Sequence, residues 1–450
     1  MSTKDLFLIV DYNLSRVADV AYMARYARQA YRVRSLLIRP DPGPRDYLIC
    51  DDVIDLDPRR ADFVEQAVSA LGDKAARVRG AVVFSDNAVH SGAALLERLG
   101  LPVDDAALAA GAFSKHVYRQ AEARHRPLLE AQRLMAPDCE RIDSMAALEA
   151  FARRHPRGFV LKPSCEGNNR GVVLVRAGDD LARAFDEVAP YLAEGVICEE
   201  LITFRREFSY DGIGALAFVT EKVSASGRYP VEIAQVLPAN LLDAERHTLR
   251  RAGDLCNVLV GQRDGPFHNE IKLSDDGARA AVVEPNRRPG GMKIWSLAQA
   301  VYGIDLYARW VDTALACAAP IDLPPPRLQG ATVMLGVASD GLFAQDDAED
   351  GKRLFESALV ATIAAHGLAP GQLRAGDFDW LVRERRVVHA VPRDNADFLA
   401  QVTIFLGTFE TDIRGVLLTL REQWQELLSD AQADLRPYAA NAKPAASAPL

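Results

Sequence analysis

Short apolar runs alternate with longer amphipathic stretches over the first hundred residues. The apolar runs predict buried strands, and the stretches between them have the helical period. The predicted strands are 6–10, 33–38 and 81–84, and the predicted helices are 14–30 and 87–99. This order predicts a small parallel α/β domain over residues 1–105. Val10-Asp11-Tyr12-Asn13 follows the first strand in place of a G-x-G-x-x-G turn, so a dinucleotide site is disfavoured.

A second α/β region follows over residues 106–320, and its strands carry more polar residues. Ser114 is a candidate cap for a helix that begins at Lys115. The further helices are predicted at 146–154, 179–193, 240–260 and, as one long helix, 297–316. The strands are predicted at 159–162, 171–175, 196–202, 206–210 and 216–223, with a hairpin over 267–286. Within this region, residues 140–200 are expected to form a small lid subdomain.

The remainder of the chain begins at a stiff linker, Leu323-Pro324-Pro325-Pro326. Beyond it the pattern predicts an α+β domain over residues 321–436, and a tail over 437–450 that is rich in Ala, Pro, Ser and Asn and expected to be disordered. The elements predicted in this domain are a strand at 331–337, a helix at 350–366, a strand pair near 386–391, and helices within 394–407 and 411–430.

Polar residues recur at alternate positions on both strands of the 267–286 hairpin. Ser274-Asp275-Asp276-Gly277 is a strong turn signal, and a hairpin centred near Gly277 places Glu270 opposite Glu284 and His268 opposite Asn286. Two opposed carboxylates repel unless a cation lies between them. Carboxylate and amide oxygens suit Mg²⁺ better than zinc. From the hairpin alone, a Mg²⁺ site and an ordinary solvated face both stay open.

Composition narrows the classes of function. The hydrophobic share of 49% and charged share of 26% are those of an ordinary globular protein. The formal net charge of −9 argues against nucleic acid or an anionic membrane as the main partner. The chain has neither a signal-peptide core after Met1 nor an apolar run long enough to span a membrane. Its six cysteines form no C-x-x-C pair, so we expect a cytoplasmic protein without a zinc knuckle or a disulfide framework.

Two further segments carry candidate chemistry. Lys162 ends a strand and opens a small-residue loop that runs to Gly171. Such a loop can cradle phosphates with its backbone N–H groups, or it can be a plain hairpin connection. The strand Cys198–Ile202 ends in acids, with Glu207 beyond it, and is a candidate edge for a purine and a ribose. Each signal is weak alone.

The order of these pieces resembles the ATP-grasp superfamily. Within it, the chain is most similar to the carboxylate–amine ligases that include carnosine synthase and the L-amino acid (dipeptide) ligases. His268-Asn-Glu270-Ile-Lys272 resembles that group's H-x-E-x-K strand, and Glu284-Pro-Asn286-Arg-Arg288-Pro-Gly290-Gly291 resembles its E-x-N-x-R-x-G-G. The resemblance covers about residues 1–320. It implies an ATP-grasp fold with an N-terminal Rossmann-like (pre-ATP-grasp) domain and a C-terminal α+β domain.

The resemblance also implies a role for each motif residue. The nucleotide would be held by Lys115 and Lys162, by the loop with Ser164, Gly167 and Gly171, by Glu199, Glu200 and Ile202 at the adenine, and by Glu207 at the ribose. The metal, Mg²⁺ or alternatively Mn²⁺, would be held by Glu270, Glu284 and Asn286. The carboxylate substrate and γ-phosphate would lie at Arg288 and Gly290-Gly291, with Glu232 and Met292 as specificity candidates. Arg287 points the other way by alternation.

The implied reaction activates a carboxylate, expected to be that of an amino acid, as an acyl phosphate and couples it to an amine. Arg288 and Lys162 would be catalytic. For His268 two roles are open: general base for the amine, or support for Glu270. The alternatives are an ATP-grasp carboxylase or nucleotide-biosynthesis ligase that uses bicarbonate or formate, and an ATP-binding regulatory module without catalysis. Similar ligases are frequently homodimers, and small molecules are the expected partners.

Overall fold

The computed structural model describes residues 5–102, 104–167, 170–225, 229, 231–316, 318–319 and 321–440. It divides into two compact units, and each is described by itself. The first unit comprises Met1–Lys222 and Leu237–Pro326, and the second comprises Val223–Val236 and Arg327–Leu450. The boundary at Pro326 falls directly after the proline-rich linker. No helix in the described ranges is long and apolar enough to cross a membrane.

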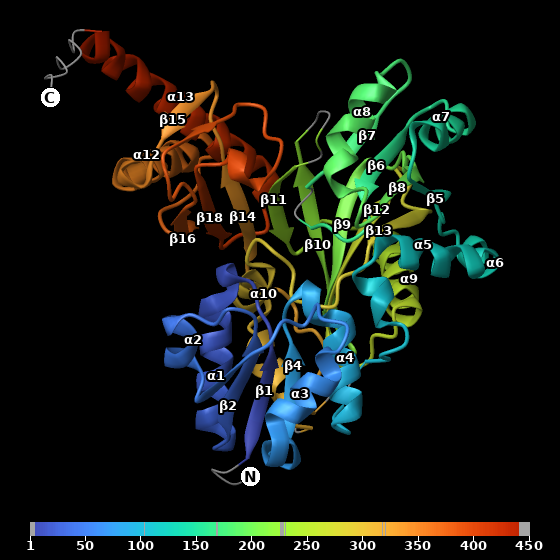
Figure 1. Cartoon of the computed structure of the whole chain (residues 1–450). Helices are drawn as coiled ribbons and strands as arrows, with labels where there is room; N and C mark the ends of the chain where they lie inside the picture. Colours follow the sequence, from blue (N-terminus) through green and yellow to red (C-terminus); the bar gives the residue numbers. More distant parts are fainter. Residues whose placement is uncertain are drawn as a thin grey trace, which may run out of the picture. The chain divides into compact units, whose positions relative to one another are not determined.

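The first unit begins with the parallel α/β domain that the hydrophobic pattern predicted (Figure 1). Its sheet has the order β3-β2-β1-β4. All pairs in this sheet are parallel, and β2 and β3 lie on one side of β1 whereas β4 lies on the other. The strand order therefore reverses at the β1/β4 pair, where open α/β sheets form crevices beyond the strand ends. The strands are β1 Leu6–Val10, β2 Arg34–Arg39, β3 Asp52–Asp55 and β4 Val78–Val83, and the helices are α1 Val17–Tyr31, α2 Pro44–Ile49, α3 Phe63–Leu71 and α4 Val89–Arg98.

A separate antiparallel sheet with its own apolar core occupies residues 139–200. Its order is β5-β8-β6-β7, so β8 and β6, which end in candidate site residues, are central. The strands are β5 Cys139–Ile142, β6 Phe159–Pro163, β7 Val173–Val175 and β8 Val196–Glu200. Helices α7 Met145–Arg154 and α8 Leu181–Val188 cover it, and α5 Lys115–Arg124 and α6 Arg126–Ala131 precede it. Ser114 caps α5 as predicted, since its hydroxyl accepts the N–H of Val117.

The remaining strands of the first unit form an antiparallel arrangement in the order β13-β12-β9-β10. They are β9 Arg206–Ile213, β10 Leu216–Ser224, β12 Pro266–Leu273 and β13 Ala280–Glu284. Helix α9, Asp243–Leu259, packs closely on β9, because a Cβ added at Gly253 would lie 2.0 Å from the Tyr210 ring. These strands carry the candidate metal residues.

The single helix predicted at 297–316 is wrong. The structure has two helices there, α10 Ile294–Tyr302 and α11 Leu306–Ala314. Gly303 ends the first in a left-handed conformation with φ of 75°, which glycine adopts without steric cost. The side chain of Asp305 then accepts the N–H of Ala308 and caps the second. The helix-ending glycine and the capping aspartate therefore divide the segment into two helices, although its apolar residues recur with a helical period throughout.

The second unit is an α+β body around the strand order β11-β14-β18-β16. Its strands are β11 Glu232–Leu237, β14 Gln329–Leu335, β15 Gly341–Phe343, β16 Leu373–Trp380, β17 Arg386–Val388 and β18 Ala400–Leu406, and its helices are α12 Ala348–Ala365 and α13 Ile413–Ala440. Two predictions fail here. Residues 400–406 form a strand where a helix was predicted, and the strand near 386–391 pairs with β15 far upstream. Helix α13 includes residues 437–440 of the predicted tail, whereas 441–450 lie outside the described residues.

Candidate functional site

The β12–β13 hairpin places Glu270 directly opposite Glu284, as the sequence predicted. The next predicted pair also meets: the N–H of His268 donates to the carbonyl of Asn286 at 2.8 Å. The Asn286 amide lies 3.5 Å from Glu284 Oε1 and donates to the His268 carbonyl at 3.2 Å. Two carboxylates and an amide oxygen therefore lie together on one hairpin.

A β-bulge creates this register. From the turn, the ladder pairs Leu273 with Ala280 and Ile271 with Val282, and then shifts so that Glu270 meets Glu284. Without the extra residue, Val283 would stand opposite Glu270 and the second carboxylate would face away. Bulges commonly re-aim a side chain in this manner. The simple hairpin prediction placed the pair correctly but did not foresee the bulge.

Two lysines offset the repulsion between the opposed carboxylates. Lys222 Nζ lies 2.5 Å from Glu270 Oε1, and Lys115 Nζ lies 2.8 Å from Glu284 Oε2. Burial alone lowers the pKa of Lys115, but the Glu284 carboxylate outweighs it and raises that pKa above the usual value. The side chain of Glu270 is 25% exposed and that of Glu284 is 20% exposed, so ions from the solvent can reach both carboxylates.

The oxygen donor set of this hairpin fits a hard divalent cation such as Mg²⁺. Glu270, Glu284 and Asn286 supply two carboxylates and one amide, and the carboxylate charges demand a cation. In the described ranges, no group of three or more His, Cys, Asp or Glu side chains has metal-binding geometry. The candidate site therefore depends on two carboxylates and an amide, and suits an ion that also takes ligands from a bound substrate.

Lys162 lies in a buried charge cluster next to the hairpin. Its ammonium is 2.7 Å from Glu199 Oε2, and both side chains are about 95% buried. Burial alone raises the pKa of Glu199, but the Arg119 guanidinium and the Lys162 ammonium outweigh it and lower that pKa to about 2. Glu199 thus binds both Arg119 and Lys162, and Arg119 also binds the buried carboxylate of Glu122. The cluster pairs two cations with two carboxylates.

The loop after Lys162 lies against the start of α5. Lys115 Nζ donates to the Glu166 carbonyl at 2.7 Å, and Ser164 Oγ lies 3.0 Å from Ser114 Oγ and accepts the N–H of His116 at 3.2 Å. The two predicted glycines differ: a Cβ at Gly167 would meet open space, whereas one at Gly171 would lie 2.6 Å from the Tyr191 ring. Gly171 is thus needed for packing, and residues 168–169 of the loop lie outside the described residues.

The predicted adenine and ribose residues lie on β8, β9 and the segment between them. Glu200 is turned away from Glu199 and accepts the N–H of Asp138 at 3.3 Å, while its own N–H donates to the Asp138 carbonyl. Ile202 is buried in the irregular segment 201–205. Glu207 lies 2.8 Å from Lys272 Nζ, its cross-strand partner. The Glu200 N–H already has a backbone acceptor, so Glu200 could offer a purine little more than its carbonyl.

His268 belongs to a buried polar chain. Its Nδ1 lies 2.6 Å from Asp211 Oδ1, and its Nε2 lies 3.4 Å from Glu270 Oε1. Asp211 also accepts the hydroxyls of Ser209 and Thr220. Burial lowers the pKa of His268, but Asp211 and Glu270 outweigh burial and raise that pKa to about 9. The ring is therefore protonated at neutral pH, which favours support of Glu270 over the role of general base.

Two side chains from the N-terminal α/β domain hold the segment that follows Asn286. Arg288 Nε lies 2.7 Å from both carboxylate oxygens of Asp86, which follows β4 at the predicted crevice. Arg16 donates to the carbonyls of Pro289 and Gly290. Gly290 packs tightly, because a Cβ there would lie 2.8 Å from His268 Nδ1. The glycine-rich segment is thus fixed from both sides.

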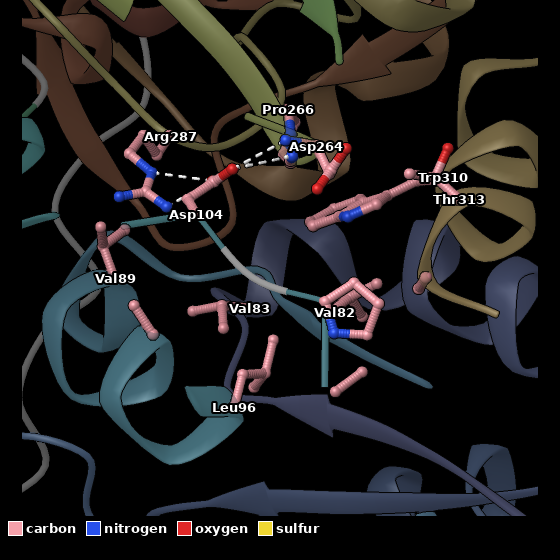
Figure 2. A pocket seen from close by; sticks show the side chains of 15 residues that line it. Val82, Val83, Val89, Leu96, Asp104, Asp264, Pro266, Arg287, Trp310 and Thr313 are labelled. Carbon is pink, nitrogen blue, oxygen red and sulfur yellow. Dashed lines mark hydrogen bonds and ion pairs between the residues drawn. The ribbon is translucent and has the colours of Figure 1, made fainter. Parts of the chain in front are cut away.

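Arg287 points away from this site, as alternation predicted. Figure 2 shows it among the lining of another cavity, of about 60 Å³, where it binds Asp104. Asp104 also accepts three backbone N–H groups, those of Arg263, Asp264 and Gly265. These contacts stabilise the segment that leads into β12.

The specificity candidates have different surroundings. Met292 and Lys293 both adopt left-handed backbone conformations, with φ of 47° and 60°, directly after Gly291. Such conformations are unusual for residues other than glycine and are concentrated at functional sites. Glu232 is the first residue of β11 and belongs to the second unit.

A small cavity of about 30 Å³ joins these groups, room for a water molecule or an ion. Its lining includes five charged residues, Asp86, Lys115, Glu166, Glu284 and Arg288, together with Cys165, Gly167 and Asn286.

Five charged residues of the site carried no role in the sequence interpretation: Arg16, Asp86, Arg119, Asp211 and Lys222. Asp86 had a detectable signal, because it follows a strand at the carboxyl edge of a parallel sheet. Arg119 lies four residues after Lys115 and hence on the same helix face. Asp211 and Lys222 could not be assigned without the strand order.

Comparison with known proteins identifies the fold. No family model matches the sequence. The chain is 37% identical over 112 residues to carnosine synthase 1 of Gallus gallus, which covers 25% of this chain and 12% of that protein. It is 27% identical over 146 residues to D-alanine–D-alanine ligase B of Chromobacterium violaceum, covering 32% and 45%. The chain thus spans less than half the length of these curated relatives in the matched regions.

Solved structures match nearly the whole chain. An L-amino acid ligase from Bacillus licheniformis has a TM-score of 0.68 at 17% identity, over 93% of this chain and 97% of that one. A carboxyaminoimidazole ribonucleotide synthase from Aspergillus clavatus, solved with ATP, has a TM-score of 0.65 at 13% identity, over 94% and 100%. The chain has the fold of the ATP-grasp ligases, and the predicted resemblance and fold class are confirmed.

Proposed function

We propose that this chain is an ATP-grasp ligase that activates a carboxylate with ATP and joins it to an amine, releasing ADP and phosphate. The observation that carries the proposal is the Glu270/Glu284 pair, which opposes two carboxylates beside Asn286, Lys115, Lys162 and Arg288. This combination suits a triphosphate and its metal. The likeness to L-amino acid ligase and carnosine synthase supports an amino acid as the carboxylate.

In the proposed reaction a substrate carboxylate oxygen attacks the γ-phosphorus, and the bond to the ADP oxygen breaks. The amine nitrogen then attacks the acyl carbon, phosphate leaves with the bonding electrons, and the nitrogen loses a proton. Lys115 and Lys162 would neutralise the phosphates, and Arg288 would orient the carboxylate. Asp86, which now binds Arg288, would share that guanidinium with the substrate.

Glu270, Glu284 and Asn286 would hold Mg²⁺, which when bound supplies positive charge to the phosphate oxygens. Lys222 and Lys115 hold these carboxylates in place without a metal. His268, protonated near neutrality, would keep Glu270 in position and would not accept the amine proton. The proton would leave through another acceptor or water.

A phosphate-release screen over pairs of amino acids, with mass spectrometry of the products, tests the proposal. The expected result is phosphate release that requires ATP, Mg²⁺ and both substrates, with an amide of summed mass less one water. The matched control is Glu284→Gln, which keeps the shape but removes the charge, and which should release no phosphate above background.

Two results would redirect the proposal. Phosphate release that needs bicarbonate and no amino acid would indicate a carboxylase-type ligase, the activity class suggested by the second structural match. Tight ATP binding without hydrolysis across the whole panel would indicate a regulatory nucleotide-binding module.

A further inference from the structure

Arg119 is the most completely bonded side chain near the site. It lies on α5 and is 1% exposed. Its Nε and one Nη donate to the two oxygens of Glu199, at 3.0 and 3.2 Å, and its other Nη donates to Glu122 at 2.5 Å. The remaining donors reach the carbonyls of Val282 and Val283, at 2.9 and 3.0 Å. All five N–H groups of the guanidinium are thus used.

The two carbonyls belong to the β-bulge that re-aims Glu284. Along a regular strand successive carbonyls point in opposite directions, so one guanidinium could not reach two in a row. The bulge turns the carbonyls of Val282 and Val283 toward the same partner. Arg119 therefore binds the irregularity that gives Glu284 its place opposite Glu270.

The Nε and one Nη of Arg119 bind the carboxylate of Glu199 on β8. That carboxylate also binds Lys162, the lysine expected at the phosphates. The guanidinium of Arg119 therefore connects Lys162, which would bind the phosphates, with the β13 segment that carries Glu284, a proposed metal ligand. Burying such a group with two carboxylates is a poor source of stability, because the desolvation cost rivals the attraction. The contacts of Arg119 are better explained if they fix the positions of Glu199 and of the β13 backbone.

We propose that Arg119 is a positioning residue that holds the bulge of β13 and the Glu199–Lys162 pair in mutual register, so that metal and nucleotide bind together. This inference rests on the proposed function. It assigns Arg119 no contact with substrate. Its role is to fix Glu284 and Glu199, the side chains on either side of it.

The test compares Arg119→Lys with Arg287→Lys. Lysine keeps the charge but has three donors and no planar fork, so it cannot hold both carbonyls and both carboxylates. Arg287 is another buried arginine, close after the same strand, and it is paired with Asp104 outside the site. The measurement is binding of a non-hydrolysable ATP analogue by titration calorimetry across a Mg²⁺ series, well below the melting temperature of each variant.

For Arg119→Lys we expect the Mg²⁺ midpoint to rise by about 10- to 100-fold, the usual cost of losing a group that orients a metal ligand. Arg287→Lys should lower the melting temperature without moving that midpoint. Equal Mg²⁺ midpoints for wild type and Arg119→Lys would overturn the inference. A shift of the same size in Arg287→Lys would overturn it too, since the effect would then be general destabilisation.

A second variant covers the case in which Arg119→Lys does not fold. Glu122→Gln keeps the size of the side chain but weakens the anchor of the guanidinium on α5, and should shift the Mg²⁺ midpoint in the same direction by a smaller factor. An unchanged midpoint in that folded variant would also count against the inference. Failure of the proposed function is read separately, from the phosphate-release screen on the wild type. A wild type that binds the ATP analogue with Mg²⁺ but releases no phosphate would overturn the proposed function and leave the comparison of Mg²⁺ midpoints intact.

Discussion

The two compact units bury charge very differently. The first unit buries a dense set of ionisable side chains, including Arg119, Glu122, Lys162, Glu199, Asp211, His268 and Arg287. In the described part of the second unit, Asp397 is the only charged side chain among the buried residues, and it holds the N–H groups of a turn. A buried charge is costly unless it is paired. The buried charges of the proposed site therefore lie in the first unit, and the described core of the second unit is largely apolar.

Arg288→Lys is expected to have the largest effect, because it removes the fork that would bind a carboxylate and a phosphate in a defined geometry. We expect turnover to fall by about 10²- to 10³-fold, comparable with the loss of one donor to a developing charge. Steady-state kinetics at saturating ATP, with the carboxylate varied, measures this. A variant with wild-type turnover would remove Arg288 from the site.

The buried carboxylate of Glu199 should give the first unit a distinctive dependence on acid. Its pKa is lowered from the usual 4.5 to about 2, so its contribution is present above pH 4.5 and is lost as the pH falls through about 2. A pKa lowered from 4.5 to about 2 corresponds to a contribution on the order of 3 kcal/mol to the free energy of unfolding.

Urea unfolding of wild type and Glu199→Gln between pH 7 and pH 2.5 measures that contribution. The difference in free energy of unfolding between them should be largest near neutrality and should shrink toward the acid end. A difference that is constant over this range would show that Glu199 is not held ionised by Arg119 and Lys162.

Gly290→Ala should have a smaller effect confined to the glycine-rich segment. The added Cβ would lie 2.5 Å from Ile294 Cδ1 and 2.8 Å from the His268 ring, so one of them must shift. Overpacking of this kind typically costs about 1–3 kcal/mol. Gly291→Ala is the matched control, because a Cβ there meets nothing within 4 Å. The melting temperature should fall more in the first variant than in the second.

The smallest effect is expected in the second unit. Arg353 and Asp350 form an exposed ion pair one helical turn apart on α12. Exposed pairs of this type contribute little to stability. Arg353→Ala should leave both the melting temperature and ATP-dependent phosphate release unchanged, and a clear loss of turnover would contradict the contrast between the units.

Much of the first unit could be predicted from the sequence, because its patterns are local. The apolar run Leu6–Val10, the Ser114 cap and the turn before Gly277 each specify their element over a few residues. The Glu270–Glu284 pair followed from strand alternation and the turn. The family motifs then connected these pieces.

The remainder depended on contacts between distant segments. The pairs Arg119–Glu199, Arg288–Asp86 and His268–Asp211 each join parts of the chain that only the fold brings together. In the second unit, residues 400–406 became a strand because β14 and β16 pair with both of its edges. Its β-branched residues Val402, Thr403 and Ile404 favour a strand as well, a local signal that the helix prediction underweighted.

The most direct test of the central claim measures how ATP-analogue binding depends on Mg²⁺ in wild type and in the double variant Glu270→Gln/Glu284→Gln. We expect Mg²⁺ to strengthen binding in the wild type and to have no effect in the double variant, which keeps the shape of the hairpin without its two charges. Equal strengthening by Mg²⁺ in both proteins would contradict the account, because the metal would then bind elsewhere.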